Sequence, residues 1–181
     1  MSSPSSAPAP SPCAGTVRGG PDHLRGYVED WLCGRRTLPE VPLDIDMTWT
    51  FVECDGAAGS SYCSYRNGEG SDLILRVPNA QPETVTEVRV DRTTFAADAD
   101  EYARQFVEAW VNGNQPRVRA LSTPEVAAFT AGNPPPESGY EVVLSPSEVP
   151  EFEVRSSGSD YLLIVRGRLG RPNAITNITG T

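Results

Sequence analysis

The chain of 181 residues contains no lysine, a single histidine and no run of about 18 apolar residues. Without such a run, no segment is expected to span a bilayer. Its fifteen basic residues face 24 acidic ones, which leaves a net charge of −9. A surface of this charge repels phosphate backbones, so we expect no nucleic-acid partner. The single histidine and the lack of any Cys-x-x-Cys spacing argue against a zinc site, and we expect neither a metal nor a cofactor.

Four cysteines occur, at positions 13, 33, 54 and 63. Cys54 and Cys63 bracket the small residues DGAAGSSY, which would let two facing strands turn tightly and bring the two Cα atoms within disulfide range. We therefore predict a Cys54–Cys63 hairpin bond, against the alternative of two buried free thiols. By remainder Cys13 would pair with Cys33, although four cysteines permit three connectivities. Disulfides are typical of oxidising compartments, which predicts an extracellular or cell-surface protein.

The opening MSSPSSAPAPSPCAGT consists mainly of serine, proline and alanine. This composition predicts a disordered tether over residues 1–20. It has neither the basic start nor the apolar core of a secretory signal. We expect the signal or anchor of an exported protein to lie upstream of Met1, and membrane tethering through that removed anchor is one option. The alternative is a cytosolic protein with a low-complexity tail.

The sequence also repeats itself. YVEDWLCGR at 27–35 and FVEAWVNGN at 106–114 match with an offset of 79 residues. Their apolar spacing predicts amphipathic helices that end at Gly34 and Gly113. Alternating segments that predict strands follow at 48–53, 62–66, 71–77 and 84–90, and again at 140–144, 151–155, 159–165 and 174–179. We predict an α+β protein whose two similar helix-then-antiparallel-sheet units, residues 21–91 and 92–181, form an internal pseudo-dimer.

The second repeat carries a family resemblance. FVEAWVNGNQPRVRALSTPEV, a helix ending in aromatic-x-x-x-Trp-x-x-Gly followed by Leu-x-Thr-Pro, resembles the nuclear transport factor-like superfamily, also called SnoaL-like. CDGAAGSSYC and LILRV resemble a segment of secreted or lipid-anchored actinobacterial proteins of unknown function. The resemblance implies cystatin/SnoaL-like units with a curved sheet. That scaffold hosts isomerases, hydrolases and non-catalytic modules.

Few residues are candidates for chemistry. Enzymes of this superfamily place acids, tyrosines or histidines inside a cone of helices and sheet, and no motif places such residues here. We therefore favour an exported, non-enzymatic binding or interaction module for an unknown protein or small ligand. Trp49 and Tyr62 are its candidate binding residues, whereas Trp31 and Trp110 lie on apolar helix faces and are expected in the core.

The alternative is a small SnoaL-like enzyme or ligand carrier that uses a pocket in the second unit. A buried cavity above about 300 Å³ with at least one carboxylate or tyrosine in its wall would favour this alternative, and a filled core would favour the binding module. The side chains whose convergence would mark such a site are those of Tyr140, Glu141, Glu153, Arg155, Asp160 and Arg166.

Overall fold

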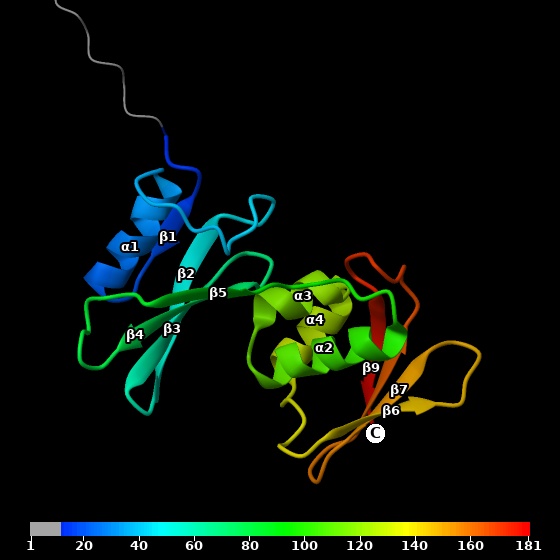
Figure 1. Cartoon of the computed structure of the whole chain (residues 1–181). Coiled ribbons are helices and arrows are strands. Elements are labelled where there is room, and N and C mark those ends of the chain that lie inside the picture. Colours follow the sequence, from blue (N-terminus) through cyan, green and yellow to red (C-terminus); the bar gives the residue numbers. More distant parts are fainter. Residues whose placement is uncertain (1–11) are drawn as a thin grey trace, which may run out of the picture. The chain divides into compact units, whose positions relative to one another are not determined.

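The computed structural model describes residues 12–181, which fold into two compact units (Figure 1). Unit 1 contains the chain up to Asn67 together with Asp72–Asp91, and unit 2 contains Gly68–Ser71 and Arg92–Thr181. Apart from the turn 68–71, the division between the two units falls after residue 91. Each unit combines helix with its own sheet, so the α+β class is confirmed. Among the described residues, no helix has the length and hydropathy needed to cross a bilayer.

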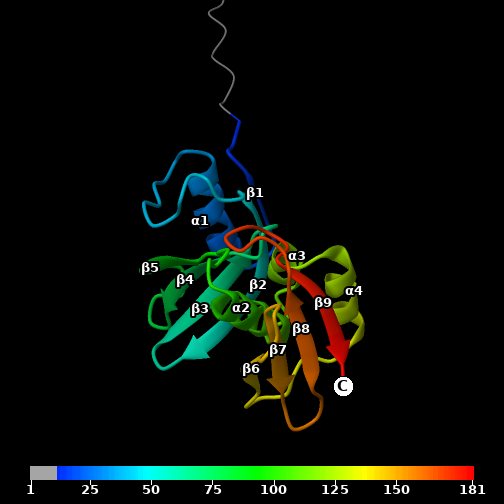
Figure 2. The same cartoon turned by 90° about the vertical axis from the view of Figure 1, so that its right-hand side faces the viewer.

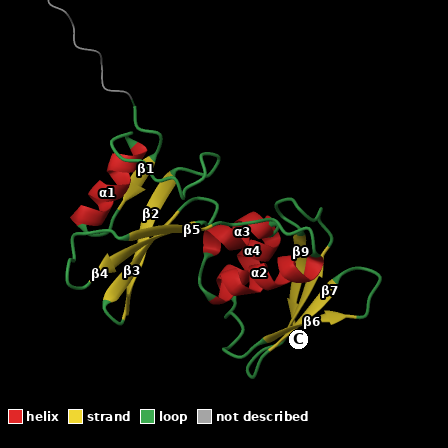
Figure 3. Cartoon of the chain, in the orientation of Figure 1, coloured by secondary structure: helices red, strands yellow, loops and turns green. Residues whose placement is uncertain are grey.

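Unit 1 packs one helix against a five-stranded sheet (Figures 1 and 3). Its elements are β1 (Thr16–Arg18), α1 (Asp22–Leu32), β2 (Thr48–Ala57), β3 (Ser60–Arg66), β4 (Asp72–Pro78) and β5 (Glu87–Asp91). The strands follow one another in sequence order, with β1 parallel to β2 and the others antiparallel. Leu24, Val28 and Leu32 lie on one stripe of α1, as the periodicity predicts, and are buried in the core of this unit.

The predicted tether is too long at its C-terminal end. Residues 1–11 lie outside the described part of the chain, but residues 16–18 form strand β1, which pairs with β2. The N–H of Ala14 donates to the carbonyl of Leu32 at 2.7 Å, and Cys13 is bonded to Cys33. These contacts fix the segment to the end of α1, and composition alone gives no sign of them.

Both disulfides join the predicted partners, Cys13 with Cys33 and Cys54 with Cys63. Cys54 and Cys63 stand directly opposite each other in the β2–β3 ladder, and three further residue pairs continue the ladder to the turn. The turn itself is tight, because Gly59 adopts a φ of 79° that other residues rarely tolerate. No described cysteine is free.

Unit 2 packs three helices on one face of a four-stranded antiparallel sheet. Its elements are α2 (Ala99–Val111), α3 (Gln115–Leu121), α4 (Pro124–Gly132), β6 (Glu141–Ser145), β7 (Glu151–Arg155), β8 (Tyr161–Val165) and β9 (Ile175–Gly180). Figure 2 shows α4 beside β9, where the N–H of Thr123 donates to the carbonyl of Ile175 at 3.0 Å. Burial alternates along β7 and β8, so one face of the sheet meets the helices and the other faces outward.

The two units share an order of elements and a helix ending. In each, a helix precedes a meander of four antiparallel strands. The N–H groups of Gly34 and Gly113 donate to the carbonyls of Trp31 and Trp110, both at 3.1 Å, and both glycines have positive φ. The predicted helix stops are therefore confirmed, at the predicted offset of 79 residues.

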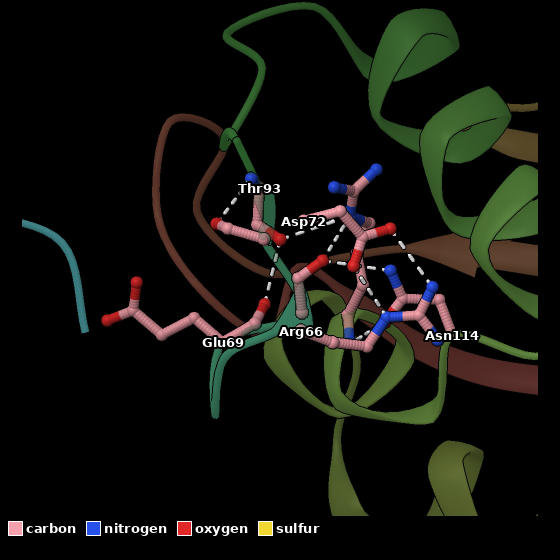
Figure 4. A network of polar contacts seen from close by, with 8 residues as sticks. Arg66, Glu69, Asp72, Thr93 and Asn114 are labelled. Atoms are coloured by element: carbon pink, nitrogen blue, oxygen red, sulfur yellow. Dashed lines mark hydrogen bonds and ion pairs between the residues drawn. The ribbon is translucent and has the colours of Figure 1, made fainter. Parts of the chain in front are cut away.

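A polar network in unit 2 ties the turn 68–71 to the start of α3 (Figure 4). The carbonyl of Gly70 accepts hydrogen bonds from Asn114 Nδ2 at 2.8 Å and from the buried Arg117 Nε at 3.2 Å. Thr93 Oγ1 accepts from Arg117 Nε at 3.0 Å and donates to the carbonyl of Glu69 at 2.7 Å. Since Asn114 is also the N-cap of α3, its amide both begins that helix and binds the turn.

Removal of the Cys54–Cys63 bond should lower the free energy of unfolding by about 2–3 kcal/mol, because the bond restricts the unfolded chain. The double change Cys54→Ala/Cys63→Ala tests this by urea unfolding. The Cys13–Cys33 bond spans 20 residues rather than 9. Its removal in Cys13→Ala/Cys33→Ala should therefore lower the free energy of unfolding by about 0.7 kcal/mol more. A free thiol found by non-reducing peptide mapping of oxidised protein would contradict the pairing.

Two buried tryptophans should differ in their tolerance of phenylalanine. Trp110 Nε1 donates to the carbonyl of Thr130 at 3.2 Å, whereas Trp49 Nε1 is buried without an acceptor. Trp110→Phe removes a hydrogen bond and Trp49→Phe removes an unsatisfied donor, so Trp110→Phe should cost about 1 kcal/mol more in urea unfolding. Equal costs for the two variants would show that the Trp110 bond contributes nothing.

Candidate functional site

The space between the helices and the sheet of unit 2 is filled by aromatic side chains. The ring of Trp110 lies 4.8 Å from that of Tyr161 and 6.5 Å from that of Phe129, both edge-on. Tyr161 donates its hydroxyl hydrogen to the carbonyl of Pro134 at 2.6 Å. The polar tips of Trp110 and Tyr161 are thus both bound to main-chain carbonyls. Aromatic contacts and main-chain hydrogen bonds thus hold this part of the core together.

Tyr102 anchors the connection between β8 and β9. Its hydroxyl donates to the carbonyl of Arg171 at 2.8 Å and accepts from the N–H of Ala174 at 3.2 Å. Burial raises the pKa of Tyr102, while the bond from Ala174 works in the opposite direction. The phenol therefore stays protonated and keeps donating at all neutral pH values. Its role is to hold the loop.

The two predicted binding residues, Trp49 and Tyr62, differ in their exposure to solvent. Trp49 is 1% exposed and packs 6.2 Å from Trp31, so its side chain cannot meet a partner directly. This corrects its assignment as a binding residue. It points inward because it alternates with the exposed Thr48 and Thr50 in β2. Trp31, expected in the core, is half-buried instead, and Tyr62 is half-buried on β3, where it remains a candidate.

Three of the six candidate residues of the alternative site do converge. Glu153, Arg155 and Asp160 line a surface pocket of about 330 Å³, and Arg155 Nη2 donates to Glu153 Oε2 at 2.5 Å. The pocket lies along outward-facing side chains of β7, and Tyr161 of the aromatic core also lines it. The hydrogen bond and charge of Glu153 raise the pKa of Arg155, so this guanidinium has no proton to give in the neutral range.

A second pocket in unit 2, of about 380 Å³, lies beside α3 and α4. Ala127, Ala128 and Ala131 supply an apolar wall from α4. The facing side carries the polar groups of Gln115, Arg119 and Asn173. We call this site the α3–α4 pocket. Its small apolar wall and polar rim can hold an apolar side chain and hydrogen-bond the groups attached to it.

Asn173 closes the α3–α4 pocket against α3. Its φ of 62° is the left-handed conformation that asparagine tolerates better than most residues. Its N–H donates to the carbonyl of Ala120 at 3.0 Å. In the amide orientation that satisfies both groups, its side-chain nitrogen donates to the carbonyls of Ser122 at 2.8 Å and Arg119 at 3.2 Å. Sequence reasoning missed this pocket, because no motif reports that residue 173 returns to α3.

Among the described residues, the side chains that commonly bind metals do not gather in one place. In residues 12–181, no three histidine, cysteine or acidic side chains are placed to hold a metal ion. The histidine, His23, is exposed on α1 and lines a pocket of about 240 Å³ in unit 1 next to the Cys54–Cys63 bond. Comparisons with protein families, curated proteins and solved structures found no match to this chain.

Tyr102→Phe should destabilise the protein and weaken its response to alkali. It leaves the buried N–H of Ala174 without an acceptor, which costs about 1–3 kcal/mol at neutral pH. In the wild type the folded pKa of Tyr102 is raised above 10.0, so the unfolded phenol ionises first and stability falls as the pH rises past about 10. The free energy of unfolding of the variant, measured with urea, should fall less steeply between pH 9 and 11.

Tyr62→Phe, whose hydroxyl makes no hydrogen bond with the described residues, is the control at neutral pH. A wild-type slope retained in Tyr102→Phe would contradict this role.

Proposed function

We propose that this protein is an exported, non-enzymatic binding module that holds a segment of a partner in the α3–α4 pocket of unit 2. The observation that carries the proposal is the position of this pocket on the outside of the helices. Trp110, Phe129 and Tyr161 pack together between the helices and the sheet, which favours binding at the outer side. There the alanines of α4 offer an apolar surface, next to the guanidinium of Arg119.

Export is supported by covalent structure. Two disulfides, one of them exposed at Cys54, would be reduced in a cytosol that keeps thiols free. The Cys13–Cys33 bond fixes the start of the described chain to α1. A folded module attached behind a Ser/Pro/Ala-rich segment suits a secreted or membrane-anchored protein.

We further propose that the two units are SnoaL-like copies of one ancestral unit. Supporting this are the repeated helix endings, with equal hydrogen bonds at Gly34 and Gly113, and the shared order of helix and meander. β4 and β8 carry the similar stretches LILRV and LLIV, and each is the third of its four antiparallel strands. An actinobacterial lipoprotein or secreted protein remains the source that the resemblance implies.

The alternative function, a small enzyme or ligand carrier, would use the pocket beside Glu153, Arg155 and Asp160. Its favouring observation is the convergence of a carboxylate and a guanidinium around a void of ligand size. The carboxylates and the guanidinium that line that pocket suit binding of a polar ligand.

Filling the α3–α4 pocket should block binding. A random peptide display library selected on the oxidised wild-type protein should yield peptides that bind its pocket. These peptides should bind the Ala128→Trp variant about tenfold more weakly than the wild type, a loss of about 1.4 kcal/mol in binding free energy. Because Ala128 is exposed, the added indole should occupy the pocket without disturbing the core. Ala58→Trp, on the exposed turn of unit 1, is the matched control and should bind as the wild type does.

The selection can fail in two informative ways. Peptides that bind Ala128→Trp and wild type equally would contradict the pocket as the site. A library from which nothing is enriched above an empty support would contradict peptide binding altogether. The urea unfolding midpoints of Ala128→Trp and Ala58→Trp, compared with that of the wild type, establish that each variant is folded.

A further inference from the structure

The arginines of unit 2 divide into two groups. Arg104 and Arg155 form ion pairs with Asp100 and Glu153, and Arg92 and Arg117 also have bonding partners. The other four are exposed and make no hydrogen bond or ion pair through their guanidinium groups with the described residues: Arg119, Arg166, Arg168 and Arg171. Three of these four lie in the β8–β9 connection, and the fourth lies on α3. Within unit 2, the arginines without such a bond therefore lie mainly in the β8–β9 connection.

The β8–β9 connection is held against its neighbours along its length (Figure 1). The N–H of Gly167 donates to the carbonyl of Ala174 at 3.0 Å, and that of Gly170 to the carbonyl of Ala96 at 2.8 Å. The hydroxyl of Tyr102 binds the carbonyl of Arg171. These bonds use the main chain and leave the arginine side chains free, so the charges are presented from a fixed backbone.

The same connection borders the α3–α4 pocket. Asn173 lines the pocket, and its bonds to the carbonyls of Arg119 and Ala120 hold the end of the connection against α3. Leu169, 38% exposed, stands between two of the free arginines in the sequence RLGR. Asp98, two residues after Ala96 in the sequence, accepts from the N–H of Glu101 as the N-cap of α2. It is thus engaged in capping the helix.

We propose that these arginines recognise the carboxylates of a short acidic peptide segment of a partner protein, whose apolar side chain enters the α3–α4 pocket. This inference rests on the proposed binding function and names its ligand class. Guanidinium groups bind carboxylates through paired hydrogen bonds, and arginines around an apolar contact are typical of protein interfaces. A pocket of about 380 Å³ with an apolar wall suits one anchoring side chain.

A short segment fits the charge distribution better than an extended polyanion. A membrane surface or a nucleic acid would face much of the protein at once, and the net charge of −9 would repel it. A short segment seated in the pocket meets Arg119, which lines it, and the β8–β9 connection, which borders the pocket through Asn173. The acidic surface elsewhere then directs such a segment toward this region rather than holding it at other sites.

The test repeats the display selection with two charge-matched variants as targets. Arg168→Gln/Arg171→Gln removes two of the free arginines of unit 2. Arg18→Gln/Arg89→Gln removes two exposed unit 1 arginines that likewise make no hydrogen bond or ion pair with the described residues. We expect wild type and the unit 1 variant to enrich peptides rich in Asp and Glu, and the unit 2 variant to lose this enrichment.

A direct measurement follows with the most enriched acidic peptide and its Glu→Gln, Asp→Asn counterpart, both labelled with fluorescein. By anisotropy the acidic form should bind wild type at least tenfold more tightly, and the unit 2 variant should lose most of that difference. Binding of the acidic form should weaken as salt rises. Equal affinity of the two forms, with both still blocked by Ala128→Trp, would overturn the acidic ligand while leaving the pocket intact.

Flotation with phosphatidylglycerol-containing vesicles tests whether the arginines bind an anionic lipid surface instead of an acidic peptide. Flotation of wild type that is lost in Arg168→Gln/Arg171→Gln, without enrichment of acidic peptides, would assign the arginines to a lipid surface and overturn the proposal. Loss of acidic-peptide binding in the unit 2 variant while Ala128→Trp binds normally would contradict the pocket of the proposed function instead. Unchanged urea unfolding midpoints are expected for both double variants. None of the four substituted side chains makes a hydrogen bond or ion pair with the described residues.

Discussion

The filled aromatic interior of unit 2 is the constraint on which its surface depends. Trp110, Phe129 and Tyr161 occupy the region in which a sheet-and-helix cone would otherwise enclose a ligand. Their edge-on contacts stabilise the core, and the polar tips of Trp110 and Tyr161 are bound to main-chain carbonyls. This packing favours recognition by the outer sides of the helices and loops of the unit.

Local patterns in the sequence were sufficient to predict helices α1 and α2 and the eight antiparallel strands. Helical spacing around Trp31 and Trp110, with glycines three residues later, predicted both helix ends, because a left-handed residue is needed to close either helix. Alternation predicted the eight meander strands, and the small residues between Cys54 and Cys63 predicted their hairpin. Each of these features is set by residues within about ten positions of one another.

Features that depend on pairing between distant residues could not be predicted from local sequence patterns. Strand β1 forms inside a segment that resembles a tether, because β2 supplies its partner more than 25 residues later. A bulge between Phe51 and Glu53 shifts the register of β2, so alternation counted from Trp49 does not carry through to Cys54. The α3–α4 pocket requires Asn173 to meet α3 from over 50 residues away. Long-range contacts of this kind leave no periodic signal.

The differences between the units locate function better than their similarities. In unit 1 the segment after the helix buries Leu38, Val41 and Ile45 in its own core, whereas in unit 2 the corresponding segment forms α3 and α4 and builds a pocket. The β4–β5 connection, NAQPETVT, carries no arginine, whereas the β8–β9 connection carries three. Both parts of the proposed binding surface thus lie in connections that the shared helix-and-meander framework does not require. A framework held by its own core leaves such connections free to acquire a ligand, and here the acquired groups are an apolar wall and unpaired guanidinium groups on a fixed backbone.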